Sequence, residues 1–106
     1  AIAADFGITI NSQPASASVA GGAAGQFVVA AVSRPTGGTL SFQWQVSTDA
    51  GSTFADSADA GVVSGSATNT LDISDVAGLD ANQYRCVVSV TGGADVTSDA
   101  ATLTVT

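Results

Sequence analysis

The chain has 106 residues and a formal net charge of −7, and this length suits one domain with a single modest core. Its nine acidic residues are all Asp, and its only basic residues are Arg34 and Arg85. So few cations argue against nucleic acid as a partner, because nucleic-acid binding depends on Lys and Arg that neutralise phosphates. They equally argue against anionic membrane surfaces, and no apolar run is long enough for membrane insertion.

The residue types also bear on catalysis and metal binding. A single cysteine, Cys86, excludes a disulfide within the chain. Without His, Glu or a second Cys, the usual zinc, copper and iron sites cannot form within one chain, and we expect no cofactor. General base catalysis normally uses His or a tuned carboxylate, and the Asp residues are scattered over expected turns. We therefore expect no enzymatic activity.

Short alternating runs separated by glycine-containing turns predict an all-β chain. The first run, residues 8–10, is followed by Pro14, which indicates an edge or a break in a strand. A second short stretch over residues 15–19 continues the alternation and ends before paired glycines. The next run, residues 26–33, alternates apolar and other side chains until Pro35 interrupts it.

Residues 40–47 form the clearest predicted strand, because the apolar and polar side chains alternate throughout. The side chains expected to point inward are Leu40, Phe42, Trp44 and Val46, and those expected to point outward are Ser41, Gln43, Gln45 and Ser47. Burial of Phe42 and Trp44 should stabilise the fold by several kcal/mol, at about 25 cal/mol per Å² of apolar surface.

The second half of the chain contains a weak region and then three further predicted strands. Residues 57–69 are small and polar, and they predict little regular structure. A short strand is expected over residues 71–73, and Val76 and Leu79 are expected to close one end of the core. The expected inward side chains of the last two strands are Tyr84, Cys86, Val88, Val90, Ala101, Leu103 and Val105.

Several motifs, in order along the chain, have the spacing of a known family. They are Gly25-x-Phe27-x-Val29, Phe42-x-Trp44-Gln45-Val46-Ser47, Leu71-x-Ile73, Asp80-Ala81-Asn82-Gln83-Tyr84-Arg85-Cys86 and Leu103-x-Val105. The chain resembles the immunoglobulin-like superfamily, and most closely the intermediate-type modules of bacteriophage virion proteins and bacterial surface proteins. The resemblance implies an all-β, antiparallel sandwich of seven to nine strands. It also implies one domain over residues 1–106, with residues 1–7 as a linker or an exchanged N-terminal segment.

The resemblance also implies structural roles for individual residues. Tyr84 corresponds to the tyrosine-corner residue, whose hydroxyl bonds to upstream backbone, and Asp80 is expected to bond within its turn. The first cysteine of the family's cross-sheet disulfide is missing, because Val29, or alternatively Ala31, stands at its position. Such a disulfide is worth about 2–4 kcal/mol. Here apolar packing of Val29, Trp44 and Cys86 is expected to replace it, with Cys86 a buried and inert thiol.

The missing disulfide has a consequence for the origin of the chain. A sandwich without a disulfide can fold in a reducing cytosol, where phage structural proteins fold before assembly. Bacterial surface proteins are also commonly poor in cysteine. The resemblance therefore favours a prokaryotic origin and leaves phage and bacterium open.

Residues 47–54 match the Asp-box pattern, Ser-x-Asp-x-Gly-x-Thr-aromatic. We interpret this motif as a hairpin in which Asp49 bonds turn amides, Gly51 takes a positive φ and Phe54 enters the core. Asp49, Asp56 and Asp59 are weak candidates for a calcium site. The chain has no D-x-D-x-D-G run and no Glu as a bidentate ligand, which favours the structural interpretation.

A candidate contact face lies on the outward side of two predicted strands and contains Gln43, Gln45, Arg85, Val87 and Ser89. The alternative is an ordinary solvated surface. The expected function is a non-enzymatic structural or adhesive module, displayed on a phage virion as a decoration, capsid-surface or tail appendage. Its partners would be other protein subunits, or proteins and glycans of the host surface.

Two other settings remain open from the sequence. The first is a repeat or filament subunit of an extracellular bacterial adhesin, in which the segment Ala1 to Gly7 pairs with the next subunit. The second is a carbohydrate-binding accessory domain of a secreted hydrolase. Such a domain needs an exposed aromatic platform, for which only Phe6 and Phe54 remain as candidates.

Overall fold

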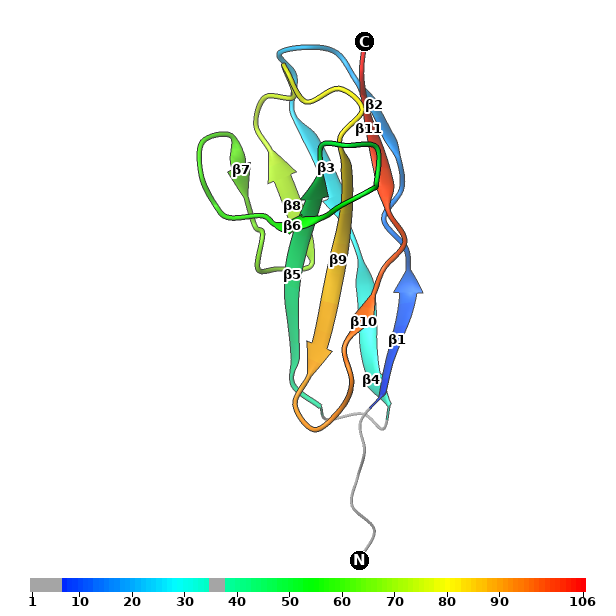
Figure 1. Ribbon diagram of the computed structural model, residues 1–106. Coiled ribbons are helices and arrows are strands. Elements are labelled where there is room, and N and C mark those ends of the chain that lie inside the picture. Colours follow the sequence, from blue (N-terminus) through cyan, green and yellow to red (C-terminus); the bar gives the residue numbers. More distant parts are fainter. Residues whose placement is uncertain (1–6, 35–37) are drawn as a thin grey trace, which may run out of the picture.

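The structure, a computed structural model, describes residues 7–34 and 38–106. These residues form two packed layers of β-strands, which Figure 1 shows from the side of the β5–β9 layer. The strands are β1 (Gly7–Ser12), β2 (Ala17–Val19), β3 (Gly25–Val28), β4 (Ala30–Arg34), β5 (Leu40–Ser47), β6 (Ala55–Asp56), β7 (Val63–Ser64), β8 (Thr70–Ile73), β9 (Gln83–Val90), β10 (Val96–Thr97) and β11 (Ala101–Val105). The all-β sandwich predicted from the sequence is therefore confirmed.

One layer has the strand order β2-β11-β9-β5-β6, and β10 also pairs with β9. The other layer consists of the sheet β3-β8-β7 and the pair β1-β4. The chain passes from β3 to β4 through the single residue Val29. All pairs are antiparallel except β2 with β11. Within the described residues no helix is long and apolar enough to cross a lipid bilayer.

The long pair β5–β9 is the centre of the first layer. It runs without a register shift from Leu40 opposite Val90 to Ser47 opposite Gln83. Trp44 therefore lies directly opposite Cys86, and both side chains are fully buried. Side chains alternate between the two faces of a strand, and in β9 every second residue is buried, as the sequence predicted.

The described part of the chain has eleven strand segments, and counting β1–β2 and β3–β4 each as one interrupted strand leaves nine, within the seven to nine expected. Pro14 is buried between β1 and β2, and beyond it the chain crosses to the other layer and pairs with β11. Val29 separates β3 from β4, and its N–H donates to the carbonyl of Asn69 at 3.0 Å. The interrupted first strand was predicted from Pro14, whereas nothing in the alternation of residues 26–33 indicates the break at Val29.

The core lies between the layers and contains Phe27, Val29, Trp44, Leu71, Ile73, Val76, Tyr84, Cys86, Val88, Ala101 and Leu103. The Phe27 and Tyr84 rings join the two layers by stacking at a centroid distance of 5.0 Å. The expected plug is confirmed, because Val76 is buried and Leu79 packs against the core. Leu40, Phe42 and Val46 point inward as predicted, and they pack against this core although each is only partly buried.

Gly7, the last residue of the expected linker or exchanged segment, is paired within this domain. Gly7 is the first residue of β1 and lies opposite Arg34 of β4. The remaining residues of the expected linker, 1–6, lie outside the described residues, as does Pro35. The expected strand pairing of residues 1–6 with another subunit therefore stays a prediction.

We predict that Gly65→Ala destabilises the fold far more than Gly78→Ala. Both glycines have a positive φ, +75° and +82°, which costs an L side chain about 1–2 kcal/mol. A Cβ at Gly65 would also collide with the backbone carbonyl of Thr70, whereas a Cβ at Gly78 would meet nothing within 4 Å. Urea unfolding should show a loss at least about 2 kcal/mol larger for Gly65→Ala. Equal losses would contradict the collision.

Candidate functional site

The residues of the predicted contact face come together on the outer side of β5 and β9. The register places Gln43 opposite Val87 and Gln45 opposite Arg85. Residues directly opposite in an antiparallel pair share one face of the sheet. All four are partly exposed, whereas Trp44 and Cys86 between them are buried on the other face. Their role as a contact face stays a prediction.

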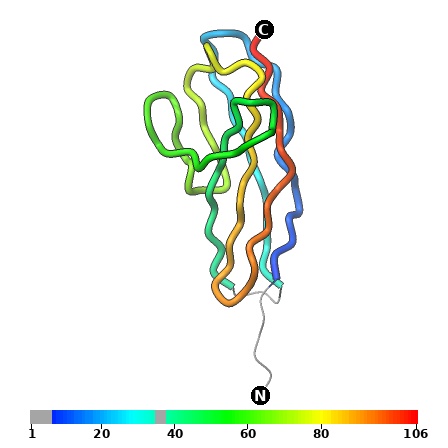
Figure 2. Tube along the Cα trace, in the orientation of Figure 1, coloured from blue at the N-terminus to red at the C-terminus, as the bar shows by residue number. Residues whose placement is uncertain are grey.

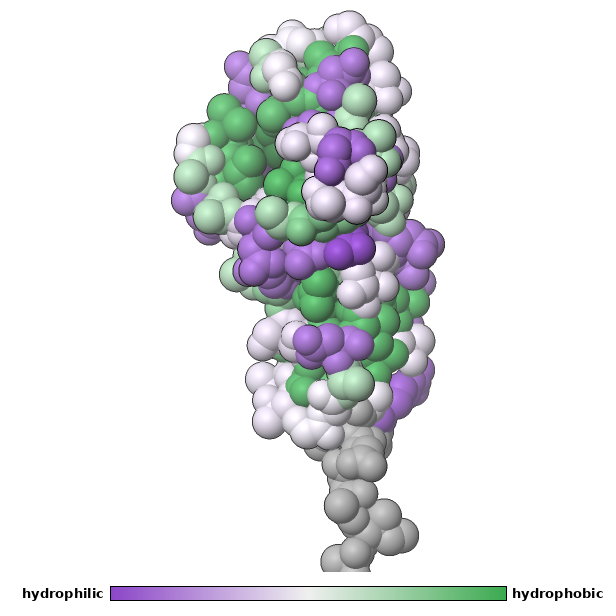
Figure 3. Space-filling model, viewed as in Figure 1, coloured by the Kyte–Doolittle hydropathy of each residue, from purple (hydrophilic) through white to green (hydrophobic). Residues whose placement is uncertain are grey.

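The β5–β6 hairpin extends this face by one more strand. Asp56 lies opposite Gln45, so three side chains from neighbouring strands form a line. Arg85 Nε donates to Gln45 Oε1 at 2.8 Å, and Gln45 Nε2 donates to Asp56 Oδ1 at 3.0 Å. We call Asp56, Gln45 and Arg85 the charged row. In Figure 3 a band of hydrophilic residues crosses the middle of the domain on this side.

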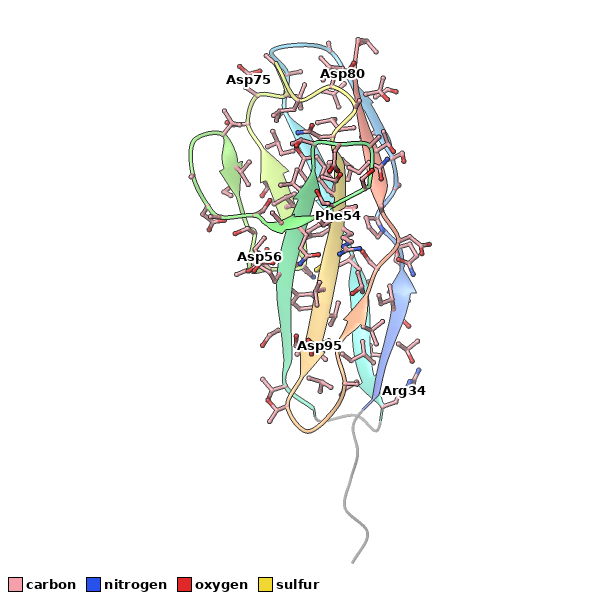
Figure 4. The ribbon with its side chains drawn as sticks, in the orientation of Figure 1. Arg34, Phe54, Asp56, Asp75, Asp80 and Asp95 are labelled. Atoms are coloured by element: carbon pink, nitrogen blue, oxygen red, sulfur yellow. The ribbon has the colours of Figure 1, made fainter. Side chains whose placement is uncertain are left out.

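Phe54 belongs to this outer face, which corrects the prediction that it enters the core. The Arg85 guanidinium carbon lies 4.0 Å from the centroid of the Phe54 ring, a cation–π arrangement. Phe54 is only partly buried and lies next to the row, as Figure 4 shows with its neighbour Asp56. Phe54 directly precedes β6 and is two residues before Asp56, so the alternation of extended backbone places both on the side of Gln45. The spacing of Phe54 and Asp56 is visible in the sequence, but only the register of the hairpin shows which face these two residues share.

Gln43 anchors the backbone of the hairpin. Its Nε2 donates to the carbonyl oxygens of Trp44 at 2.7 Å and Ser57 at 2.8 Å. The Ser57 N–H donates in turn to the Trp44 carbonyl at 2.9 Å. Gln43 thus holds β5 and the segment after β6 together. The Gln43 side chain therefore bonds backbone of the hairpin, whereas Gln45 and Arg85 bond side chains of the outer face.

The Asp-box residues form the turn between β5 and β6, as the motif predicted. Asp49 accepts hydrogen bonds from the Thr53 hydroxyl at 2.6 Å, the Thr53 N–H at 2.9 Å and the Ser47 hydroxyl at 2.7 Å. Gly51 has a φ of +89°, and Ala50 also has a positive φ, of 59°. The bonds from Thr53, followed by those from Ser47, lower the pKa of Asp49 from 3.8 to about 2. The carboxylate holds the turn together.

The three candidate calcium ligands are not brought together. Asp49 is used in its turn, Asp56 bonds Gln45, and Asp59 accepts from the N–H and hydroxyl of Ser66 at 2.8 and 2.7 Å. The bonds from Ser66 lower the pKa of Asp59. Over residues 7–34 and 38–106 no group of three or more Cys, His, Asp or Glu side chains is arranged to hold a metal ion. These bonds leave the three carboxylates with structural contacts within the domain.

The residues with predicted structural roles lie in or beside the core. Burial raises the pKa of the Cys86 thiol to about 11, and its sulfur lies 3.8 Å from the Val87 carbonyl oxygen. Trp44 Nε1 donates to the Thr68 carbonyl at 2.7 Å, so the indole is both buried and hydrogen-bonded. Val29 is completely buried in the same cluster.

Two of the predicted bonds differ from those in the structure. The Tyr84 hydroxyl accepts from the side-chain amide of Asn82 at 3.4 Å, whereas the resemblance implied an upstream backbone partner. Burial raises the pKa of Tyr84. Asp80 accepts from the N–H of Val105 at 2.8 Å and thereby fastens the turn before β9 to β11. A partner 25 residues away cannot be identified from the turn sequence alone.

The chain has an immunoglobulin-like fold, which comparison with solved structures supports. No protein-family model and no curated protein matches the sequence. A chain of the titin M10–obscurin-like 1 Ig complex is 17% identical over 93% of each chain, with a TM-score of 0.66. The Ig1–2 module of the Drosophila receptor protein tyrosine phosphatase DLAR is 22% identical over 93% of this chain and 48% of its own, with a TM-score of 0.65.

The N-terminal four Ig domains of Dscam1 isoform 6.9 give a similar result. The identity is 24% over 86% of this chain and 22% of that one, with a TM-score of 0.68. This chain thus spans about one domain of these larger proteins. At such identities the likeness shows the fold alone, and no residue role is carried over. No cleft or cavity is found in the part of the chain that the structure describes.

We predict that acid weakens the Asp49 turn between about pH 4 and pH 2. The folded pKa of Asp49, about 2, lies below the ordinary value of 3.8. The contribution of the Asp49 carboxylate to the free energy of unfolding is therefore fully present above about pH 4. It is lost as the pH falls through the folded pKa. Urea unfolding across this range should show a smaller loss of stability for Asp49→Asn than for the unmodified chain.

Asp95→Asn changes an exposed Asp in the β9–β10 turn and controls for the removal of one charge. It should follow the pH dependence of the unmodified chain. A carbon-13 titration of the Asp49 carboxyl should give a midpoint near 2. A midpoint near 3.8 would show that the Thr53 and Ser47 bonds do not hold this carboxylate.

We also predict that Cys86 reacts only when the domain unfolds. With a pKa of about 11, roughly one thiol in a thousand is ionised at pH 8, and the sulfur is buried. Iodoacetamide labelling followed by mass spectrometry should be slow in buffer and should increase with urea along the unfolding curve. Cys86→Ala serves as the unlabelled control. Rapid labelling in buffer would contradict the burial of the thiol.

Proposed function

We propose that this domain is a non-enzymatic structural or adhesive module, displayed on the outer surface of a bacteriophage virion. The observation that carries the proposal is the path of the chain through the sandwich. Gly7 begins β1 at one pole, and β11 leads to Thr106 at the opposite pole (Figure 2). A domain with this path can be inserted in line as a rigid spacer and leave the sides of its sheets free for contacts.

The side that is free for contacts carries ordered polar groups. On the outer face of β5, β6 and β9 the charged row is held by two hydrogen bonds and by the stack of Arg85 on Phe54. A pre-ordered surface loses less side-chain entropy when a partner binds. The titin M10–obscurin-like 1 complex is an example of Ig domains in a protein complex. These points favour protein subunits as the first class of partner, with host-surface glycans as the second.

A surface repeat or filament subunit of a bacterial adhesin would use the same in-line chain path and is the second candidate. The accessory carbohydrate-binding domain is less favoured. Phe6 lies outside the described residues, and the Arg85 guanidinium covers one face of the Phe54 ring. A sugar platform needs an aromatic face that is open to the ligand.

Immunogold electron microscopy of a lysate from the source organism tests the setting. Antibodies against the purified domain should label virus particles in a regular pattern, at their capsid surface or tail. The control is serum absorbed with the purified domain, which should remove the gold. Gold on cell envelopes or fibres would contradict virion display and favour the adhesin. Domain recovered only in the culture fluid, joined to a hydrolase, would favour the accessory domain.

A further inference from the structure

We propose that the charged row is self-complementary and that two copies of this domain pair face to face through it. The proposal rests on the proposed function in one respect, namely that the outer face of β5, β6 and β9 is where the module makes contacts. It adds the identity of one partner, a second copy of this chain, and the residues that set its register. The two inferences can fail separately.

The order of charges along the row leads to this pairing. Asp56, Gln45 and Arg85 lie on the adjacent strands β6, β5 and β9, so the row reads negative, neutral, positive. Adjacent strands are about 4.8 Å apart. We place a two-fold axis between two such faces, parallel to the strands, so that it passes between the two Gln45 side chains. This axis brings Arg85 of each copy opposite Asp56 of the other. Two-fold pairs of this isologous kind are the commonest symmetric assemblies.

The Arg85 side chain is already held in a position to bind a carboxylate. Its Nε is used by Gln45 at 2.8 Å, and its guanidinium plane lies against the Phe54 ring. Over the described residues its Nη groups make no hydrogen bond within the chain, so their N–H donors can face a partner. A guanidinium binds a carboxylate through two parallel hydrogen bonds. Its fixed position lowers the entropy lost on pairing.

The electrostatics of the rest of the surface select this register over others. Each copy carries a net charge of −7, so the two copies repel each other in most orientations. Arg34, the other cation, lies at the pole where β1 begins and far from the row (Figure 4). On the outer face of β5, β6 and β9, an arrangement with Arg85 against a carboxylate offsets the repulsion at close range. Since the Debye length is about 8 Å at physiological salt, the general repulsion is screened more than the contact pairs.

The two-fold axis also predicts the orientation of the pair. Because it runs parallel to the strands, both copies point the same way, with their β1 poles at the same end. Val87, which is partly exposed beside Gln43, lies next to the row and adds apolar area to the contact. In a parallel pair, both modules can be attached to a support at the same end and project from it in the same direction. This arrangement suits display on a surface.

Charge reversal tests the pairing directly. The variants Arg85→Asp and Asp56→Arg each place like charges opposite one another, and the double variant restores a self-complementary row with reversed order. Sedimentation equilibrium of the unmodified chain should show a weak dimer. Each single reversal should raise its dissociation constant at least about ten-fold, and the double variant should recover most of that loss. A monomer at millimolar concentration, or single reversals without effect, would overturn the proposal.

Cross-linking tests the position of the axis with a matched control. Ser41→Cys places a thiol on the strand and face of Gln45, beside the axis, and leaves the charged row intact, whereas Gln26→Cys places one on β3, on the exposed side of the opposite layer. With a short bismaleimide, Ser41→Cys should form covalent dimers at least about five-fold faster, because pairing raises its effective concentration. Buried Cys86 supplies no competing thiol. Equal rates would overturn the proposal, and Trp44 fluorescence checks that each variant is folded.

The outcomes also separate the two inferences. A monomeric domain found on virions would overturn the pairing and leave the proposed function intact. A charge-dependent dimer found on cell envelopes would overturn virion display and leave the pairing intact.

Discussion

The register between β5 and β9 is the constraint on which the rest of this structure depends. The eight consecutive pairs from Leu40–Val90 to Ser47–Gln83 fix which side chains point into the core and which point to solvent. A slip of one residue would place Trp44 and Cys86 on opposite faces of the sheet, so either Trp44 would be exposed and Gln45 buried, or Cys86 would be exposed and Arg85 buried. Either outcome would cost several kcal/mol, because it exposes the apolar row of one strand and buries its polar row. The core and the charged row are thus two consequences of the same pairing.

The sandwich holds its two layers together without a cross-sheet disulfide. The stack of Phe27 on Tyr84 and the burial of Val29 beside Trp44 and Cys86 join the layers where a covalent bond is absent. Directed hydrogen bonds add to this packing. Trp44 Nε1 donates to the Thr68 carbonyl, and the N–H of Cys86 donates to the Ser98 hydroxyl at 2.8 Å. Each buried polar group next to the central pair therefore has a partner, which avoids the desolvation cost of an unmade bond.

Local alternation explains what the sequence could predict. The buried positions of Trp44, Tyr84 and Cys86 follow from a period of two that is visible within each strand, and the Asp-box turn follows from its short motif. Contacts between segments could not be predicted in the same way. Phe54 faces outward because of the direction in which the hairpin returns, and Asp80 bonds Val105 because β11 passes beside its turn. The charged row itself needed the pairing of Asp56 with Gln45, which no spacing in the sequence specifies.

The most direct test of the central register is nuclear magnetic resonance of the folded domain. The N–H of Trp44 donates to Ser66 and that of Cys86 to Ser98, so both residues direct their amides away from each other. They form a non-hydrogen-bonded pair, in which the opposing Hα atoms are close. We predict a strong Hα–Hα nuclear Overhauser effect between Trp44 and Cys86, together with an upfield shift of the Arg85 side-chain protons over the Phe54 ring. An effect between Trp44 and Arg85 or Val87 instead would show a slip of one residue and would contradict both the core and the charged row.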